Sequence, residues 1–203
     1  MKIQTDEYAE FFDANADNYK IVKFVPASGA ATRMFKDLFS FLCAEYVVPT
    51  TDFEKNFFAN IAIFAFYGDL DAACVKNNAH NIDELVAKGD YKAVVFNLLD
   101  FTGMNYGSLP KGLLKFHTYD ADARTSAEEH FVEGALYAAT DGVVKLHFTV
   151  SPNHKALFEE LVAERKAYYE QLFNVKYDIT FSAQKQCTDT IAVDADNAPF
   201  REN

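Results

Sequence analysis

Short apolar runs predict three strands along the chain. The first is Ile21–Pro26, which leads into a loop of small residues. The second is Val144–Val150, in which apolar residues alternate with lysine and histidine, and the third is Tyr177–Ser182. Runs of this length and pattern are typical of strands rather than helices.

Apolar residues at helical spacing occupy most of the remaining chain. Thr51 and Thr125 each stand three residues before a glutamate, which is the pattern of a capped helix start. The predicted helices are an amphipathic one ending near Asn15, one running to about Ala44, three opening at Thr51, Asn81 and Tyr91, one from Thr125 to about Ala139, and a long one from Ser151 to about Phe173.

The alternation of strands and helices predicts an α/β fold, with a mostly parallel sheet and helices on both faces. The helical stretch between the first two predicted strands is long for a crossover. It therefore predicts a helical insertion at residues 45–101, within a single α/β domain that spans residues 1–203.

Composition narrows the classes of function. The chain has 203 residues, of which 50% are hydrophobic, and a formal net charge of −11. This negative charge repels nucleic acid and anionic membranes, so neither is an expected partner. Three widely spaced cysteines, no apolar signal core and no apolar run of membrane-spanning length predict a cytoplasmic protein. The histidines and cysteines show no metal-ligand spacing.

The most informative segment is Val25–Met34, a loop of tiny residues between a predicted strand and a predicted helix. This geometry brings backbone N–H groups up to a phosphate. Arg33 stands where a forked cation could grip that phosphate. The alternative interpretation is a tight turn in which Arg33 forms an ordinary ion pair.

The same segment lacks the dinucleotide fingerprint G-x-G-x-x-G and the Walker sequence G-K-[ST]. It resembles the signature loop of nucleotide-sugar pyrophosphorylases, A-G-G-x-G-T-R-[LM], with Ser28 and Ala31 in place of two glycines. The resemblance implies that Arg33 neutralises the leaving pyrophosphate. It also implies that the nucleotide is held by Ala27, Ser28, Gly29, Ala30, Ala31 and Thr32.

A second loop, 103–112, is rich in glycine and ends in Leu109-Pro110-Lys111-Gly112. It resembles the P-K-[GP]-L motif of UDP-sugar pyrophosphorylases, which implies that Lys111 contacts the phosphates. Glu129-His130 resembles the L-x-E-[HY] pattern of that family, and the resemblance implies that Gln184 lies near the nucleobase. The alternatives are an ordinary exposed lysine and a polar residue at a strand end.

From end to end, the chain resembles an uncharacterised bacterial family that carries the runs V-P-A-S-G-A-A-T-R-M-F-K and L-P-K-G-L-L-x-F-H. That resemblance implies no established activity. It implies a Rossmann-like domain of the nucleotide-diphospho-sugar transferase type whose relatives continue past residue 203. We therefore expect an N-terminal domain that is incomplete at its C-terminus.

The resulting hypothesis is a nucleotidyltransferase-like domain that binds a nucleoside triphosphate or a nucleotide-sugar. Its parent reaction joins sugar 1-phosphate and NTP into NDP-sugar and pyrophosphate, with Arg33 and Lys111 as catalytic residues. The resemblance implies Mg²⁺, but the sequence identifies no ligands for it. The alternative is a non-catalytic nucleotide- or anion-binding or assembly module, and a dehydrogenase is a third possibility. Base, sugar and oligomeric state stay open.

Overall fold

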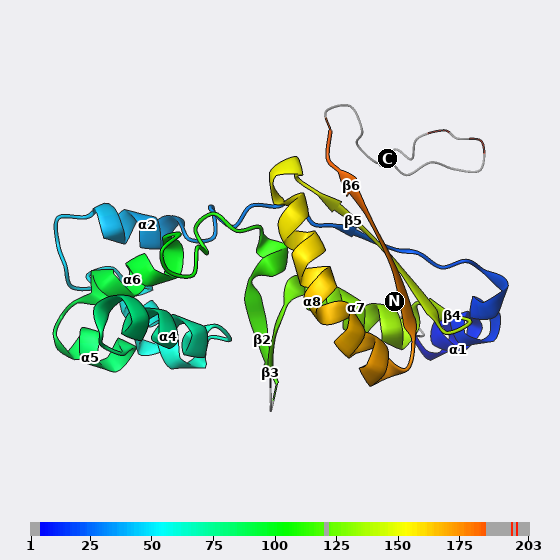
Figure 1. Cartoon of the computed structure of the whole chain (residues 1–203), viewed down its shortest axis with the longest axis horizontal. Helices are drawn as coiled ribbons and strands as arrows, with labels where there is room; N and C mark the ends of the chain where they lie inside the picture. Colours follow the sequence, from blue (N-terminus) through cyan, green and yellow to red (C-terminus); the bar gives the residue numbers. More distant parts are fainter. Residues whose placement is uncertain (1–4, 120–121, 186–195, 197, 199–203) are drawn as a thin grey trace.

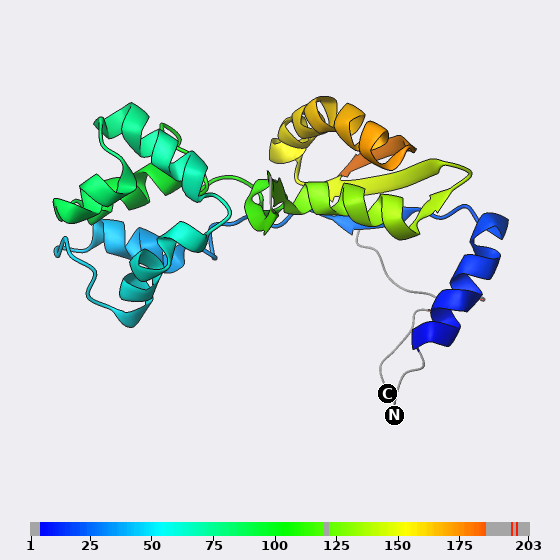
Figure 2. The ribbon, with the colours of Figure 1, turned by 90° about the horizontal axis from the view of Figure 1, so that it is seen from below.

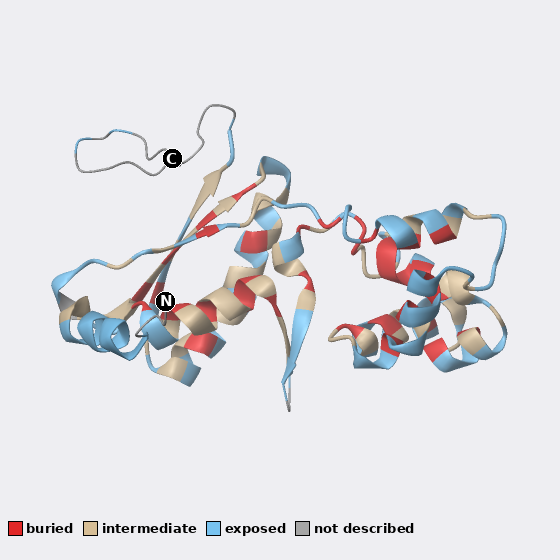
Figure 3. Cartoon of the chain, turned by 180° about the vertical axis from the view of Figure 1, so that it is seen from behind, coloured by how far each residue is buried: buried red, intermediate tan, exposed pale blue. Residues whose placement is uncertain are grey.

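The computed structural model describes residues 5–119, 122–185, 196 and 198. Two hydrophobic clusters lie at opposite ends of the molecule (Figure 1), one among the helices of residues 36–99 and one between a small sheet and the helices of residues 126–137 and 155–173. Two neighbouring passes of the chain connect these parts, and Figure 2 shows both passes between the helical part and the sheet part. Figure 3 shows that the buried residues follow the same division.

The sheet is built around one central strand. Strands β1 (Lys23–Pro26) and β6 (Lys176–Ala183) flank β5 (Val143–Val150) in parallel, and the short β4 (Ala139–Thr140) pairs with the start of β5 in antiparallel fashion. Both residues of the β4–β5 turn, Asp141 and Gly142, have positive φ angles, as tight hairpin turns require. The three predicted strands and the parallel pairing are confirmed, in a sheet that is small.

Among the described residues, the helices that pack on the sheet cover one face, so the predicted helices on both faces are not confirmed. Helices α7 (Ser126–Tyr137) and α8 (Lys155–Phe173) both cover one face, where Phe131 and Phe158 pack against Phe148 of β5. The strands follow one another across the sheet in a single direction, β1 to β5 to β6. Right-handed crossovers that proceed in one direction place their helices on the same face.

The helical part has its own core, and its helices start where the caps predict. Thr51 and Asn81 form complete capping boxes in this part, and Thr125 forms one at the start of α7 in the sheet part. The helices of this part are α2 (Lys36–Cys43), α3 (Asp52–Ala59), α4 (Tyr67–Asn78), α5 (Ile82–Ala87) and α6 (Tyr91–Leu99). Short 3₁₀ helices are η1 (Ala16–Asn18), η2 (Ile61–Ile63), η3 (Lys111–Leu113) and η4 (Pro152–His154).

Helix α2 belongs to the helical cluster, although it follows the first strand of the sheet. Its buried residues Leu38 and Phe41 pack with residues of α3–α6 rather than against β1. Between the two parts stands a hairpin that the sequence did not predict, made of β2 (Lys115–Tyr119) and β3 (Asp122–Thr125).

The predicted N-terminal helix is present as α1 (Thr5–Asn15), but it contributes no buried residue. Its apolar residues Tyr8 and Phe11 are 70% and 67% exposed. Among the described residues, no helix is long and apolar enough to cross a membrane.

Candidate functional site

The two loops singled out in the sequence lie side by side. Ala30 and Pro110 form an isolated antiparallel bridge, and the amide of Lys111 donates a hydrogen bond of 2.9 Å to the carbonyl of Gly29. The amide of Ala31 donates to the carbonyl of Leu109 at 3.3 Å. We call this pairing of residues 29–31 with 109–111 the clasp. It joins segments about 80 residues apart in sequence at the carboxyl end of β1, the edge where ligands of α/β proteins bind.

Beside the clasp lies a hollow of about 190 Å³, which we call the loop hollow. Both loops line it through Ala27, Gly29, Lys111 and Gly112. The first turns of α7 contribute Ser126, Ala127 and His130, and the sheet and α8 close its base with Val25, Pro26, Phe148 and Phe158. The structure therefore brings Lys111 and part of the predicted phosphate loop to one site.

Backbone donors of this loop are available for a ligand. Within the described part of the chain, the N–H groups of Ser28, Gly29 and Ala30 donate no hydrogen bond. Gly29 and Ala30 are exposed and Ser28 is half-buried. Ala31 differs, because its amide is used in the clasp and its side chain is fully buried in the helical cluster. Fewer backbone amides are therefore free for a nucleotide than the motif predicts, because the amide of Ala31 already donates to Leu109.

Gly112 explains how the second loop comes this close to α8. A Cβ atom at this position would lie 2.9 Å from Cζ and 3.0 Å from Cε1 of Phe158, closer than real Cβ contacts come. The ring of Phe158 is 1% exposed and packs beneath β5. The glycine is therefore what allows η3 to place Lys111 at the hollow.

Arg33 lies apart from Lys111. It lines a different, more open hollow on α2, together with Thr32, Lys36 and Ser40. Its side chain is exposed and forms no ion pair with a described residue, so the alternative of a salt-bridged turn finds no partner there. Of the predicted site residues, Ala27, Gly29 and Lys111 thus line the loop hollow, whereas Thr32 and Arg33 line the hollow on α2.

His130 is a polar group of the loop hollow whose ring is held in one orientation. Its Nδ1 lies 3.0 Å from Oε2 of Glu133, and the same oxygen lies 2.6 Å from Nζ of Lys23. The hydrogen bond from Lys23 keeps the pKa of Glu133 below its ordinary value, so this carboxylate stays ionised. An ionised carboxylate accepts a hydrogen bond from Nδ1–H, which leaves Nε2 as the ring nitrogen available to a ligand.

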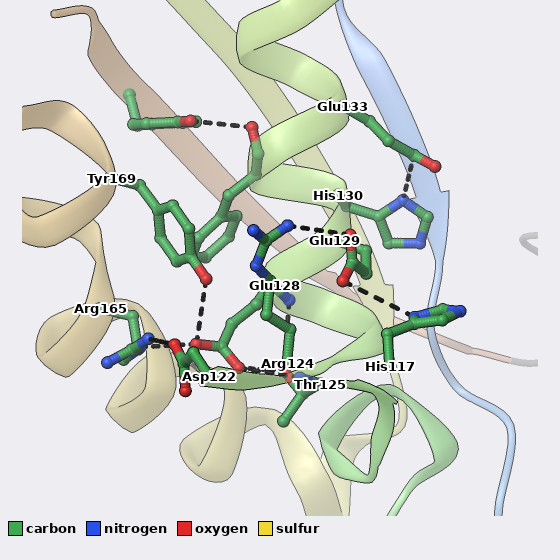
Figure 4. Close-up of polar contacts among 12 residues, drawn as sticks. His117, Asp122, Arg124, Thr125, Glu128, Glu129, His130, Glu133, Arg165 and Tyr169 are labelled. Carbon is green, nitrogen blue, oxygen red and sulfur yellow. Dashed lines mark hydrogen bonds and ion pairs between the residues drawn. The ribbon is translucent and has the colours of Figure 1, made fainter. Parts of the chain in front are cut away.

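A buried carboxylate holds α7 beside the hollow. Glu128 accepts hydrogen bonds from the amide of Thr125 at 2.9 Å and from Arg165 Nε at 2.5 Å, and the hydroxyl of Tyr169 donates to it at 3.3 Å (Figure 4). Burial, followed by the charge of Glu128, raises the pKa of Tyr169 to about 12, so the phenol stays protonated as a donor. This network fixes the N-terminus of α7, which carries Ser126 and His130.

Glu129, the neighbour of His130 in the predicted motif, points elsewhere. Its carboxylate lies 3.4 Å from Arg124 and 3.6 Å from Nδ1 of His117, both on the β2–β3 hairpin. One of its oxygens, Oε1, is buried without a hydrogen-bond partner in the described structure. Glu129 therefore contacts the β2–β3 hairpin, whereas His130 lines the loop hollow.

Gln184 follows β6 and is exposed. The backbone N–H of Gln184 donates a hydrogen bond of 2.8 Å to the carbonyl of Val150. In the same way, the backbone N–H of Ala27 donates a hydrogen bond of 2.7 Å to the carbonyl of Thr149. Both residues therefore stand at the same edge of the sheet, with β5 between their strands. Gln184 does not line the loop hollow.

The residues of the loop hollow do not form a magnesium site. Mg²⁺ is held in proteins by carboxylates, waters and substrate phosphates. The lining of the loop hollow contains no carboxylate, and the described residues hold no group of three or more metal-binding side chains. Mg²⁺ as a cofactor therefore stays a prediction from the resemblance.

A comparison with protein families matches residues 1–203 to a domain of unknown function, DUF4301. The chain belongs to the DUF4301 family. The match covers the whole chain, and the description of DUF4301 assigns no activity. Comparisons with curated proteins and with solved structures gave no match. The resemblance of this DUF4301 chain to UDP-sugar pyrophosphorylases therefore stays a hypothesis, and its site has to be argued from geometry.

Proposed function

We propose that the loop hollow binds the phosphates of a nucleoside triphosphate or a nucleotide-sugar. The observation that carries this proposal is the clasp, because it sets Gly29 and Lys111 around one hollow, with the free amides of Ser28 and Ala30 on either side of Gly29. Backbone donors and a cation at the carboxyl edge of a parallel sheet are the recurring elements of phosphate sites.

Each group has a separate task in this proposal. The amides of Ser28, Gly29 and Ala30 donate to phosphate oxygens, and Lys111 compensates their charge. The N-terminus of α7 points its partial positive charge at the same place. Nε2 of His130 supplies a further polar contact on the opposite wall.

The charge distribution supports an anionic ligand. The chain carries a net charge of −11, and seven of its described lysines and arginines form ion pairs with carboxylates. Lys111 and Arg33 form no ion pair with the described residues, although acidic side chains are abundant. A cation beside free amides attracts phosphate locally, in a protein whose net charge otherwise repels phosphate.

The parent reaction proposed for this site is the attack of a sugar 1-phosphate oxygen on the α-phosphate of an NTP, which breaks the α–β phosphoanhydride bond and releases pyrophosphate. The chain contributes positioning and charge compensation to this reaction. Arg33 would act on the pyrophosphate from the other side of the clasp.

The alternative is a non-catalytic nucleotide- or anion-binding or assembly module. Two observations favour it: Arg33 and Lys111 line different hollows, and the loop hollow supplies no carboxylate for a metal ion. Both hypotheses require phosphate binding, so binding is tested first and turnover second.

The test is isothermal titration calorimetry with UTP, ATP and pyrophosphate, with and without Mg²⁺. Lys111→Met should weaken binding by about tenfold or more, since a hydrogen bond to a charged group contributes about 1.5–3 kcal/mol. Lys76→Met is the matched control, because Lys76 is exposed on α4 and changes the net charge equally. Equal affinity for the two variants would refute the site.

Turnover then separates the two hypotheses. Pyrophosphate release in the presence of sugar 1-phosphates, abolished by Lys111→Met, supports the nucleotidyltransferase. Binding that depends on Lys111 without pyrophosphate release supports the module.

A further inference from the structure

An apolar cavity of the helical part lies outside the proposed phosphate site. It has a volume of about 390 Å³ and is lined by α2, α3, the segment around η2 and the start of β2. Its walls are mainly aromatic and include Phe35, Phe57, Phe64, Phe66, Tyr106 and Phe116. We call this cavity the aromatic hollow.

The floor of the aromatic hollow is preformed. Phe57 and Phe64 stack with ring centroids 5.5 Å apart, and Phe64 and Phe66 stack at 5.1 Å with an angle of 8° between the rings. Phe66 meets the ring of Tyr106 edge-on at 5.4 Å. Phe57, Phe66 and Tyr106 are at most 7% exposed, whereas Phe53 at the rim is 43% exposed. A flat ring can therefore enter from the rim and extend an existing stack.

The polar groups at this hollow carry no uncompensated charge. Lys115 is the one charged side chain of its lining, and its Nζ lies 2.7 Å from Oδ2 of Asp69. Asn60 donates its side-chain amide to the carbonyl of Asn56, which leaves the Oδ1 of Asn60 free to accept. The side chain of Asn56 makes no hydrogen bond among the described residues. Two amides thus offer both donors and acceptors beside aromatic walls.

We propose that the aromatic hollow is a second binding site, which takes an uncharged planar heteroaromatic ring of the purine or pyrimidine kind. Such a ring combines two stacking faces with an edge of donors and acceptors, which matches the aromatic walls and the two asparagines. A hydrocarbon chain would leave those amides unused. The volume lies within the range of small-molecule sites and is far below what a protein segment of interface size fills.

This site goes beyond the proposed phosphate binding and does not rest on it. The aromatic hollow is nevertheless close in sequence to both segments of the clasp, since Met34 and Phe35 follow residues 29–31, and Leu114–Phe116 follow η3. A ring bound in the aromatic hollow thus contacts the chain just beyond each of the two segments that form the clasp.

The test uses adenosine, guanosine, uridine and cytidine, which lack phosphate, in saturation-transfer NMR with the whole chain. We expect the ring protons of at least one nucleoside to receive more saturation than its ribose protons. Ala65→Trp should fill the hollow and weaken binding at least tenfold, because Ala65 lines it. Ala62→Trp, at an exposed position outside the lining, should leave binding unchanged.

A second variant guards against misfolding of Ala65→Trp. Asn56→Ala removes one amide from an exposed position and is expected to weaken nucleoside binding while the thermal transition stays unchanged. Lys111→Met should not alter nucleoside binding, so a failure of the phosphate site does not affect this result.

Three outcomes would overturn the proposal. The first is that none of the four nucleosides binds, and the second is that Ala65→Trp binds as well as Ala62→Trp. The third is a dimer in light scattering that Ala65→Trp dissociates while no nucleoside binds, which would make the hollow a contact between copies of the chain.

Discussion

Replacing Glu128 by alanine is expected to lower the free energy of unfolding by about 3 kcal/mol, the sum of three losses. Loss of the capping interaction with Thr125 costs about 1 kcal/mol. Loss of the charge-assisted hydrogen bond from Arg165 costs about 1.5 kcal/mol, the lower end of its range, because Arg165 is 32% exposed and keeps Asp122 at 3.2 Å. The hydroxyl of Tyr169, whose residue is fully buried, loses its acceptor, which adds about 0.5–1 kcal/mol.

Urea denaturation followed by circular dichroism measures this change. Glu128→Gln is the matched variant, because it keeps the capping acceptor and the side-chain volume and removes only the charge. It should cost about half as much, and a double-mutant cycle with Arg165→Met should show a coupling energy of about 1 kcal/mol. If Glu128→Ala costs less than about 1 kcal/mol, this network does not hold α7, and its role in placing Ser126 and His130 is refuted.

Three further outcomes are expected. Gly112→Ala should destabilise the chain by about 1–3 kcal/mol in urea denaturation and weaken pyrophosphate binding, because its methyl group would displace Phe158; unchanged stability would contradict the contact. Arg33→Ala should weaken UTP binding in calorimetry less than Lys111→Met does, since Arg33 lies in a separate hollow. Burial raises the pKa of Glu54, but hydrogen bonds from the amides of Thr50 and Thr51 and from Tyr46 outweigh burial and lower it below the ordinary 4.5. The carboxylate of Glu54 therefore contributes fully to stability at pH values above its ordinary pKa, and this contribution is lost as the pH falls through the lower pKa of the folded state. Glu54→Gln should for this reason flatten the acid limb of a curve of stability against pH.

Local structure was largely predictable, because it depends on residues close in sequence. The capping patterns at Thr51 and Thr125 marked helix starts that the structure confirms, and the helix expected to begin at Asn81 also has a capping box. The alternation in Val144–Val150 marked a strand, and it also held the signal that was missed. A parallel strand covered on both faces is apolar throughout. The polar residues Lys145 and His147 alternate with buried residues, which indicates that only one face of this strand is covered.

Tertiary partners were less predictable. Leu38 and Phe41 form an apolar stripe that fits a sheet and a helical core equally well, so the sequence could not assign α2 to the helical cluster. The motif comparison proposed that the loops at Gly29 and Lys111 belong together, but nothing local in the chain specifies their pairing. The separation of Arg33 from Lys111 depends on the direction in which the chain leaves the clasp, which residue types do not encode.

The clasp also brings together the two ends of the chain segment that forms the helical part. The chain leaves the sheet part after Gly29 and returns at Lys111, and these two residues are already hydrogen-bonded to each other. A short turn could therefore bridge the gap between them if everything in between were removed. The helical part can in this sense be excised or exchanged as a cassette, and a shortened chain of this kind would show whether the sheet, α7 and α8 fold without it.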